Sequence, residues 1–426
     1  MTLTIPDLTQ FRIERRDNGI IHFVFDCPGR TMNVFSNKAI HELAAFAEWL
    51  HRTDEVRGVV LRSGKPSGFC AGADLTELGV AYEMIVAAPE ADRFDIAFNH
   101  FFPLSHAIRR LETAGKPIAA AIAGVALGGG CELALGAHFR VLTNSRRAIM
   151  GLPEHAVGLL PGAGGTQRMP RLVGVEAGLD VLLLGRTYQG AEALSAGLVG
   201  EIVEEGAEID AAENWLLSQA AHGTQPWDRP DHVPLPHAEI AEAIERHRAR
   251  ELARMLGHEP APLAILDCVE FGLVQPIDGA IRAEMSVFAG LIQRIEPRNM
   301  IRTMFLGKQS YDKAAKEGLL PAEVESAHAA IARLVEQARA DSPGLRKAFF
   351  VDRGADAGPV QTRAGRDLWI RANDEAMIAL AALYARCEPL VADFDDVARL
   401  QLDHALARSG VVPAYLGGLS GIGGLL

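Results

Sequence analysis

The sequence predicts an α/β core followed by an all-α region. Short apolar runs typical of buried strands (59–61, 117–121 and 139–143) alternate with helix-forming segments over about the first two hundred residues, which indicates an α/β fold. Beyond a cluster of Pro, His, Asp and Gly at 223–236, we find only helical periodicity. A chain of 426 residues also exceeds the size at which one core usually keeps growing, so two domains are expected.

The α/β part opens with a hairpin and a helix. Two runs of alternating apolar residues within 11–26 flank Asn18-Gly19, and Asn-Gly is the strongest short hairpin-turn signal. Ser36 is then a suitable N-cap for a helix whose apolar residues Leu43, Phe46 and Leu50 recur at helical spacing. Later segments are assigned as helices at 71–79, 132–136 and 175–184 and as a strand at 198–203.

The all-α part follows the predicted linker 223–236. Its expected helices are 237–255, 261–271, 280–294, 321–338 and 367–387. In the fourth of these, an apolar stripe of Val324, Ala327, Ile331 and Val335 must be buried by a neighbour. Two Gly-rich segments, 354–365 and 417–424, are interpreted as a loop and a frayed terminus.

Composition narrows the class of partner and the compartment. The net charge of −12 argues against general nucleic-acid affinity, although a few local cations would suffice for an anionic ligand. Five scattered cysteines without a Cys-x-x-Cys pair indicate reduced thiols and no structural metal site. We see no signal peptide, and the longest uncharged apolar run, 117–131, is short of the ~20 residues that a membrane span needs. We therefore expect a cytoplasmic protein without a membrane span.

Three glycine-rich or proline-rich turns carry the candidate chemistry. They are 69–75 (Phe-Cys-Ala-Gly-Ala-Asp-Leu), 124–132 (ending Gly-Gly-Gly-Cys-Glu) and 151–154 (Gly-Leu-Pro-Glu), the last followed closely by 161–168. In the first two, small residues leave backbone N–H groups uncovered at a helix start. Two such groups converging on one carbonyl oxygen would form an oxyanion hole. The carboxyl groups of Glu132 and Glu154 would then hold a water and divide the work of base and acid.

Each feature also has an ordinary structural interpretation. A glycine triplet before a helix more often serves tight packing than anion binding. A glutamate at a helix start, such as Glu132, usually compensates the helix dipole, and Glu154 alone would be a turn carboxylate. The run 162–165 lacks the Gly-Lys-Ser/Thr ending of a phosphate loop, so we interpret it as a turn into a helix. The order of all three motifs at strand–helix junctions favours function.

These motifs strongly resemble the crotonase (enoyl-CoA hydratase/isomerase) superfamily over about residues 11–205. The resemblance implies a crotonase-like spiral of ββα turns that binds an acyl-CoA. It places Ala71 and Gly129 at the oxyanion hole, Glu132 as the water-activating group and Glu154 as the donor of a proton to the α-carbon. The thioester and pantetheine would lie along Ala71, Gly72, Ala73, Asp74 and Gly129, and residues 80–102 would line the acyl end.

A second resemblance covers 262–306, which is similar to the segment that leaves the hydratase domain of multifunctional fatty-acid oxidation proteins. The resemblance leads to three expected segments: a hydratase core at 1–222, a linker with helices covering the acyl-CoA site at 223–308, and a helical module at 309–426. We find no Gly-x-Gly-x-x-Gly after a strand, so no NAD-binding domain is expected. No cofactor is predicted beyond the coenzyme A of the substrate.

The predicted activity is hydration of a 2-enoyl-CoA to 3-hydroxyacyl-CoA. The first alternative is a Δ3/Δ2-enoyl-CoA isomerase, which needs one carboxylate, followed by another CoA-thioester enzyme and by a non-catalytic acyl-CoA-binding subunit. The resemblance allows a homo-oligomer, because terminal helices of crotonase relatives cover the site of their own chain or of a trimer neighbour. A loop around Arg146, about two residues longer than in common family members, could shift Glu154, and His155 could tune it.

Overall fold

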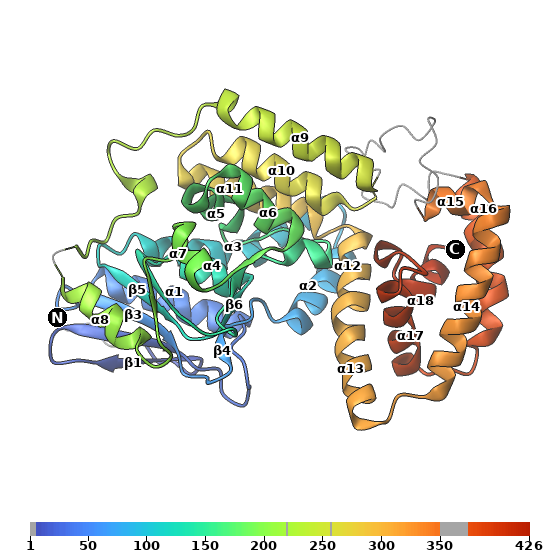
Figure 1. Ribbon diagram of the computed structural model, residues 1–426, viewed down its shortest axis with the longest axis horizontal. Coiled ribbons are helices and arrows are strands. Elements are labelled where there is room, and N and C mark those ends of the chain that lie inside the picture. The colour runs from blue at the N-terminus through green and yellow to red at the C-terminus, as the bar shows by residue number, and fades with distance from the viewer. Residues whose placement is uncertain (1–5, 219, 256–257, 350–373) are drawn as a thin grey trace. The chain divides into compact units, whose positions relative to one another are not determined.

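The computed structural model describes residues 6–218, 220–255, 258–349 and 374–426 (Figure 1). The chain divides into two compact units. The first comprises Met1–His155, Leu160–Glu245 and Ala264–Gly290, and the second comprises Ala156–Leu159, Arg246–Leu263 and Leu291–Leu426. The predicted fold class, an α/β core followed by an all-α region, is confirmed. The predicted boundaries after 222 and 308 stay predictions.

The first unit is built on a six-stranded sheet in the order β1-β2-β3-β5-β7-β10. Its strands are β1 (Phe11–Arg15), β2 (Ile20–Phe25), β3 (Gly58–Ser63), β5 (Ile118–Ile122), β7 (Phe139–Thr143) and β10 (Glu201–Val203). The first pair is antiparallel, with Phe11 opposite Phe25, and the remaining pairs are parallel. The predicted hairpin is confirmed, and Gly19 takes the positive φ of 83° that its turn requires.

A second, four-stranded sheet was not predicted from the sequence. Its order is β4-β6-β8-β9, from β4 (Gly68–Cys70), β6 (Val125–Leu127), β8 (Met150–Gly151) and β9 (Thr187–Tyr188). Strands of two or three residues are too short to show a period of two, so sequence patterns miss them. Because β4, β6 and β8 are parallel neighbours, their carboxyl ends meet at one edge. Each of the three predicted motifs continues from one of these ends.

Helices surround the sheets of the first unit. They are α1 (Asn37–His51), α2 (Leu75–Ala87), α3 (Arg93–Glu112), α4 (Gly129–Leu135), η1 (Glu154–Val157), α5 (Gly165–Val173), α6 (Val175–Leu184), α7 (Gly190–Ser195) and α8 (Glu208–Leu217). Ser36 caps α1 by accepting from the N–H of Ala39, as predicted. The helix expected at 71–79 starts only at Leu75, because the Asp74 side chain caps it and leaves 71–74 as a turn.

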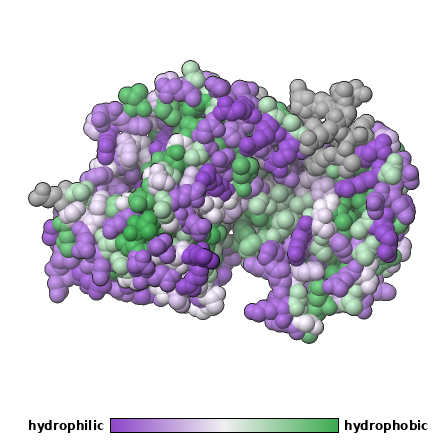
Figure 2. Space-filling model, viewed as in Figure 1, coloured by the Kyte–Doolittle hydropathy of each residue, from purple (hydrophilic) through white to green (hydrophobic). Residues whose placement is uncertain are grey.

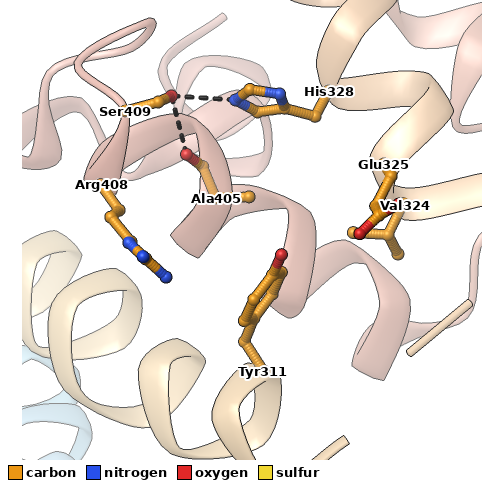
Figure 3. A pocket seen from close by; sticks show the side chains of 7 residues that line it. All are labelled: Tyr311, Val324, Glu325, His328, Ala405, Arg408 and Ser409. Atoms are coloured by element: carbon orange, nitrogen blue, oxygen red, sulfur yellow. Dashed lines mark hydrogen bonds between the residues drawn. The ribbon is translucent and has the colours of Figure 1, made fainter. Parts of the chain in front are cut away.

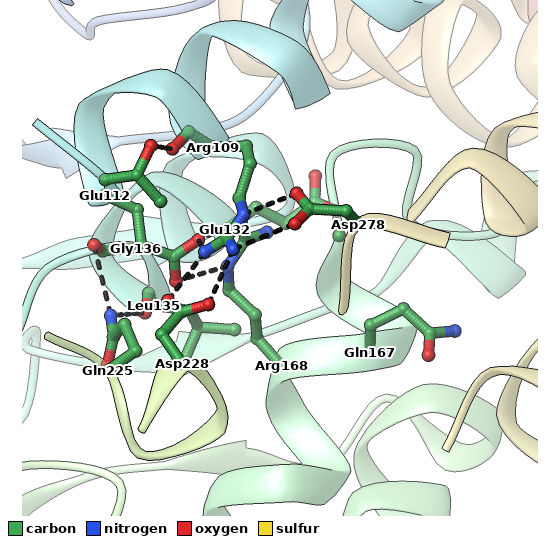
Figure 4. Close-up of polar contacts among 12 residues, drawn as sticks. Arg109, Glu112, Glu132, Leu135, Gly136, Gln167, Arg168, Gln225, Asp228 and Asp278 are labelled. Carbon is green, nitrogen blue, oxygen red and sulfur yellow. Dashed lines mark hydrogen bonds and ion pairs between the residues drawn. The ribbon is translucent and has the colours of Figure 1, made fainter. Parts of the chain in front are cut away.

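The predicted linker 223–236 is anchored at its start. It contains one 3₁₀ turn, η2 (Pro226–Asp228), with Trp227 buried. The Gln225 side-chain amide donates to carbonyl oxygens after α4, at 3.2 Å from Gly136 and 3.1 Å from Ala137 (Figure 4). Asp228 accepts from the Arg109 guanidinium at 2.6 Å. These contacts hold the segment against α3 and α4.

The helices α9 (His237–Met255), α10 (Pro260–Gly272) and α11 (Ile277–Leu291) follow. Residues 264–290, which lie within the predicted segment 223–308, belong to the first unit. There, the Gln167 amide of α5 donates to the carbonyl oxygen of Cys268 at 2.8 Å. Arg171 donates to the carbonyl oxygen of Gly272 at 3.0 Å. Residues 291–306 belong to the second unit.

Within its described residues, the second unit is helical. Its remaining elements are α12 (Ile295–Met300), the π-helical η3 (Ile301–Gly307), α13 (Lys308–Glu317), α14 (Ala322–Asp341), α15 (Pro343–Ala348), α16 (Asp374–Cys387), η6 (Glu388–Leu390), α17 (Asp396–Arg408), η7 (Ala414–Leu416) and α18 (Gly418–Leu425). The predicted stripe of α14 is confirmed, since Val324, Ala327, Ile331 and Val335 are all buried. They share one apolar cluster with residues of α16, α17 and α18.

The interpretation of 417–424 as a frayed terminus was wrong. This segment forms α18, whose Leu419, Ile422 and Leu425 are buried at helical spacing. Its glycines allow close packing: a Cβ on Gly423 would lie 2.7 Å from the Tyr384 ring. Tertiary burial outweighs the low helix propensity of glycine here. The other Gly-rich segment, 354–365, lies outside the described residues.

Hydrophilic residues cover much of the face seen in Figure 2. Within the described ranges, none of the helices combines the length and apolarity needed to cross a membrane. All five cysteines are buried with free thiols.

Candidate active site

The turns after β4 and β6 lie in direct backbone contact. A Cβ added to Gly72 would lie 3.2 Å from the carbonyl oxygen of Leu127 and 3.3 Å from the amide nitrogen of Gly129. Gly72 also has a φ of 97°, so this position requires glycine for both space and conformation. The structure therefore brings together the two turns that were predicted to supply the oxyanion hole.

The N–H of Gly129 is the better placed of the two predicted donors. Gly129 begins α4, and its N-cap, Gly128, has no side chain that could accept from the helix start. No described residue accepts a hydrogen bond from this N–H. The rings and methyl groups of Phe35 and Leu104 lie within 3.6 Å of a Cβ built on Gly129, so the donor has apolar neighbours.

The N–H of Ala71 is already engaged, because it donates to the carbonyl oxygen of Asn33 at 3.0 Å. It can serve a thioester only as a shared donor, so its role stays a prediction. Asn33 was missed by sequence analysis. Its buried side chain accepts from the N–H of Cys27 at 3.0 Å and donates to the carbonyl oxygens of Phe25 and Phe69 at 2.8 and 3.0 Å. It thereby ties the 27–35 loop to β2 and β4.

Glu132 is fixed by the turn that precedes α5. Its Oε1 accepts from the N–H groups of Ala163 at 2.7 Å and Gly165 at 2.8 Å. Among the described residues, none donates to Oε2, which leaves this oxygen for a water. Burial raises the pKa of Glu132 to about 7, against the opposing effect of the two N–H groups and of the Arg168 charge.

Glu154 lies next to the start of α4. Its Oε1 is 3.0 Å from a Cβ built on Gly128, and its Oε2 is buried without a hydrogen-bond partner in the described part of the chain. Burial, followed by the Glu132 carboxylate, raises the pKa of Glu154 well above its usual range. A buried polar oxygen without a partner is uncommon in proteins and is a signal of a binding or catalytic role. The ring of His155 lies against Gly185.

A third buried carboxyl group, Glu284 of α11, was not predicted. Its Oε1 accepts from the N–H of Gly164 at 2.6 Å, and its Oε2 accepts from the N–H of Thr166 at 3.0 Å and from the Thr166 hydroxyl. Burial, followed by Glu132, raises the pKa of Glu284 to about 8. In the sequence it is one glutamate of an amphipathic helix, and no local signal marks it.

A buried ion-pair network supports the turn and α5 (Figure 4). Arg168 donates to both carboxylate oxygens of Glu112, at 3.1 and 2.8 Å, and to the carbonyl oxygen of Ala163 at 3.0 Å. Arg109 joins Glu112 to Asp278 of α11, at 3.0 and 2.8 Å. Burial alone would raise the pKa of Glu112, but Arg168 and Arg109 lower it below its usual value. Because the charges of this network are paired with one another, we assign its residues a structural role.

A hollow on the first unit carries cations beside the predicted substrate turn. Arg30, Lys65 and Arg147 line it. Arg30 also pairs with Asp74, the cap of α2, so the hollow adjoins the 71–74 turn. Arg147 comes from the long loop noted in the sequence and lies 3.7 Å from Glu205. The effect of this loop on Glu154 stays a prediction.

The second unit has a hollow lined by Tyr311, Val324, Glu325, His328, Ala405, Arg408 and Ser409 (Figure 3). His328 and Ser409 hydrogen-bond each other at 2.9 Å, and Ser409 also donates to the carbonyl oxygen of Ala405. This hollow lacks the paired acids of the first unit. The described residues contain no group of three or more His, Cys, Asp or Glu side chains that could hold a metal ion.

Comparisons with known proteins agree with the motifs. Residues 15–225 match the family model for enoyl-CoA hydratase/isomerase. The chain is 32% identical over 317 residues to the fatty acid oxidation complex subunit alpha of Idiomarina loihiensis, with 74% of this chain and 43% of that protein covered. The subunit of the same name from Shewanella amazonensis is 33% identical over 319 residues, with 72% and 42% covered. The match thus spans less than half of the length of these relatives.

Among solved structures, an enoyl-CoA hydratase from Bacillus halodurans is similar with a TM-score of 0.49 and 19% identity. The match covers 69% of this chain and 99% of that one.

Proposed function

Residues 15–225 belong to the enoyl-CoA hydratase/isomerase (crotonase) family, and from this premise we propose that the protein adds water across the double bond of a 2-enoyl-CoA thioester. The product is a 3-hydroxyacyl-CoA. The observation that carries the proposal is the pair of carboxyl groups of the buried Glu132 and the partly buried Glu154, each with one oxygen that no described residue contacts by a hydrogen bond. Such a pair can hold one water between a base and an acid.

The environments of Glu132 and Glu154 suit them to different roles, Glu132 to that of the base and Glu154 to that of the acid. Glu132 has a pKa of about 7, so a large fraction is ionised near neutral pH and can take a proton from water. The pKa of Glu154 is raised well above its usual range by burial and by the Glu132 carboxylate, which favours the protonated form that can give a proton to the α-carbon. The water oxygen bonds to the β-carbon while the electrons of the double bond move toward the thioester. The proton that Glu132 takes and the proton that Glu154 gives balance the addition.

The thioester oxygen gains negative charge during this step and needs donors. We assign the N–H of Gly129 as the main donor and the N–H of Ala71, shared with Asn33, as the second. Substrate contacts are proposed along Ala71, Gly72, Ala73 and Asp74. The cations Arg30, Lys65 and Arg147 line one hollow together with Asp26, and we propose that they bind the phosphates of coenzyme A.

Retention of two acids favours a hydratase over the isomerase alternative, which moves one proton with one carboxylate. A non-catalytic acyl-CoA-binding subunit would need the donor turns but not a paired acid and base. The discriminating experiment gives the protein a panel of 2-enoyl-CoA esters of increasing chain length and follows the loss of the conjugated thioester absorbance. A parallel series with 3-enoyl-CoA esters would gain that absorbance if the protein is an isomerase. A protein that binds these esters but changes neither absorbance would refute the enzyme proposal.

We propose that no further cofactor takes part, because water addition needs only acid, base and oxyanion donors. When the protein is given 3-hydroxyacyl-CoA and NAD, no NADH is expected. NADH formation in proportion to the protein concentration would contradict this, and a known 3-hydroxyacyl-CoA dehydrogenase serves as the positive control.

A further inference from the structure

The turn 163–166 is held by two buried carboxyl groups in alternation. The N–H groups of Ala163 and Gly165 donate to Glu132, at 2.7 and 2.8 Å. The intervening N–H of Gly164 and the following N–H of Thr166 donate to Glu284, at 2.6 and 3.0 Å. Four successive backbone donors therefore point alternately to α4 and to α11, so the position of one acid depends on the other.

The two acids use their oxygens differently. Glu132 binds both of its N–H donors through Oε1 and keeps Oε2 out of these contacts. Glu284 uses both oxygens, and Oε2 also accepts from the Thr166 hydroxyl. Glu284 is 0% exposed, so it has no access to solvent and makes contacts only within the protein. Its contacts fix the turn, whereas those of Glu132 leave an oxygen for chemistry.

Helix α11 is itself held at a second point. Asp278, six residues before Glu284, pairs with Arg109 at 2.8 Å. Arg168 of α5 donates to the carbonyl oxygen of Ala163 at 3.0 Å, so the turn is also held from its carbonyl side. Gly164, at a φ of 95°, has no room for a side chain, because a Cβ there would meet Arg168. The turn therefore has little freedom as long as Glu284 is in place.

We propose that Glu284 is a positioning residue for the hydration reaction: it fixes the turn whose N–H groups of Ala163 and Gly165 orient the Glu132 carboxylate. The inference rests on the proposed function of Glu132. It gives the segment 264–290 a part in catalysis, although this segment lies beyond the residues that match the family model. Glu284 interacts electrostatically with these charged and titratable groups: Glu132, Glu154, Arg168, Arg171 and Cys268.

The first test is the variant Glu284→Gln. Both Glu284 oxygens face N–H donors, so an amide placed there turns an NH₂ group toward one of them and loosens the turn. We expect kcat for hydration to fall roughly 10-fold, as for a misplaced base, while KM changes by less than about 2-fold. The acidic limb of the pH profile is expected to move, since the variant alters the N–H contacts that oppose the raised pKa of Glu132.

A double-mutant cycle separates positioning from general stability. In a Glu132→Gln background, Glu284→Gln is expected to change the residual kcat by less than about 2-fold, because there is no longer a base to orient. An equal loss in both backgrounds would overturn the inference and leave the proposed function standing. If Glu132→Gln alone keeps the parent rate, the proposed function itself fails, whatever Glu284 does.

The matched control is Arg171→Lys. Arg171 joins α5 to the carbonyl oxygens of Gly272 and Gln275, each at 3.0 Å, and does not contact the 163–166 turn. The substitution keeps the charge and loses the planar fork, so the melting temperature should fall while kcat stays at the parent value. If Glu284→Gln does not fold, Glu284→Asp takes its place in the same cycle, since it keeps the carboxyl group and withdraws both oxygens from the turn. Parent kcat in a folded Glu284→Asp would contradict the proposal.

Discussion

The first unit buries Glu132 and Glu284 against one turn, whereas the second unit is centred on an apolar cluster. The buried Asp403 of the second unit is paired: it accepts from Arg302 at 2.7 Å and from the N–H of Ser420 at 3.1 Å. Burying carboxyl groups with raised pKa values costs stability. The cost of burying Glu132 and Glu284 beside each other has no counterpart in the apolar cluster of the second unit, and the proposed chemistry accounts for it.

The largest expected effect is a loss of hydration activity in variants of the first unit. Glu132→Gln and Glu154→Gln should each lower the rate of enoyl-CoA hydration by at least ~100-fold, the usual weight of a positioned acid or base. A glutamine at 132 can still accept both N–H groups through its single oxygen, so the melting temperature should stay close to that of the parent. The measurement is kcat for both variants, together with thermal unfolding and the Kd of a CoA ester.

Glu201→Gln is the control for these variants, because this glutamate is exposed on β10. It should retain the parent kcat. A double variant at 132 and 154 that still hydrates near the parent rate would refute the mechanism. Loss of hydration with isomerisation retained in Glu132→Gln would favour the isomerase alternative.

The next effect is the pH dependence of kcat/KM, which tests the assignment of Glu132 as base and Glu154 as acid. Glu132 must be ionised to act as base and has a pKa of about 7, so kcat/KM should fall as the pH drops below neutrality, approaching ~10-fold per pH unit. Glu154 must be protonated, so a second fall belongs at alkaline pH. The pH profile of kcat/KM between about pH 5 and pH 9 tests this, with apparent values that belong to the pair. A profile that stays level down to pH 5 would mean that no group with the pKa of Glu132 acts as base.

The smallest effect on activity is expected from the second unit. Ile331→Ala removes a fully buried side chain from its apolar cluster and should lower the free energy of unfolding by roughly 2–5 kcal/mol. We expect kcat at a temperature below the transition to remain that of the parent, because Ile331 supports packing only. Chemical denaturation and steady-state kinetics measure the two quantities. A fall in kcat comparable to that of Glu132→Gln would break the distinction between the units.

Much of the fold followed from local patterns. The hairpin at Asn18-Gly19, the cap at Ser36 and the stripe from Val324 to Val335 were predicted because turn conformation, capping and helical periodicity are set by neighbours in sequence. The short second sheet and α18 were missed. Strands of two or three residues have no readable period, and glycines form a helix only when a tertiary partner covers them.

The family was predicted from the motifs and is confirmed by the match over residues 15–225. The roles of Glu132, Glu154, Ala71 and Gly129 stay predictions. The structure adds the contacts around these residues. The N–H of Ala71 donates to the carbonyl oxygen of Asn33, and the backbone of Gly72 packs against that of Gly129.

The sequence by itself determined the hairpin, the cap of α1 and the apolar stripe of α14, the order of the three motifs and the residue types suited to acid–base chemistry, because each depends on a few consecutive residues. Only the tertiary structure decided that β4, β6 and β8 run parallel and so bring the motif turns to one edge. It also decided that Glu284, 120 residues after Gly164, holds the turn of Glu132. Hydrogen bonds between distant segments and the burial that shifts a pKa arise from the packed chain, and no local pattern records them.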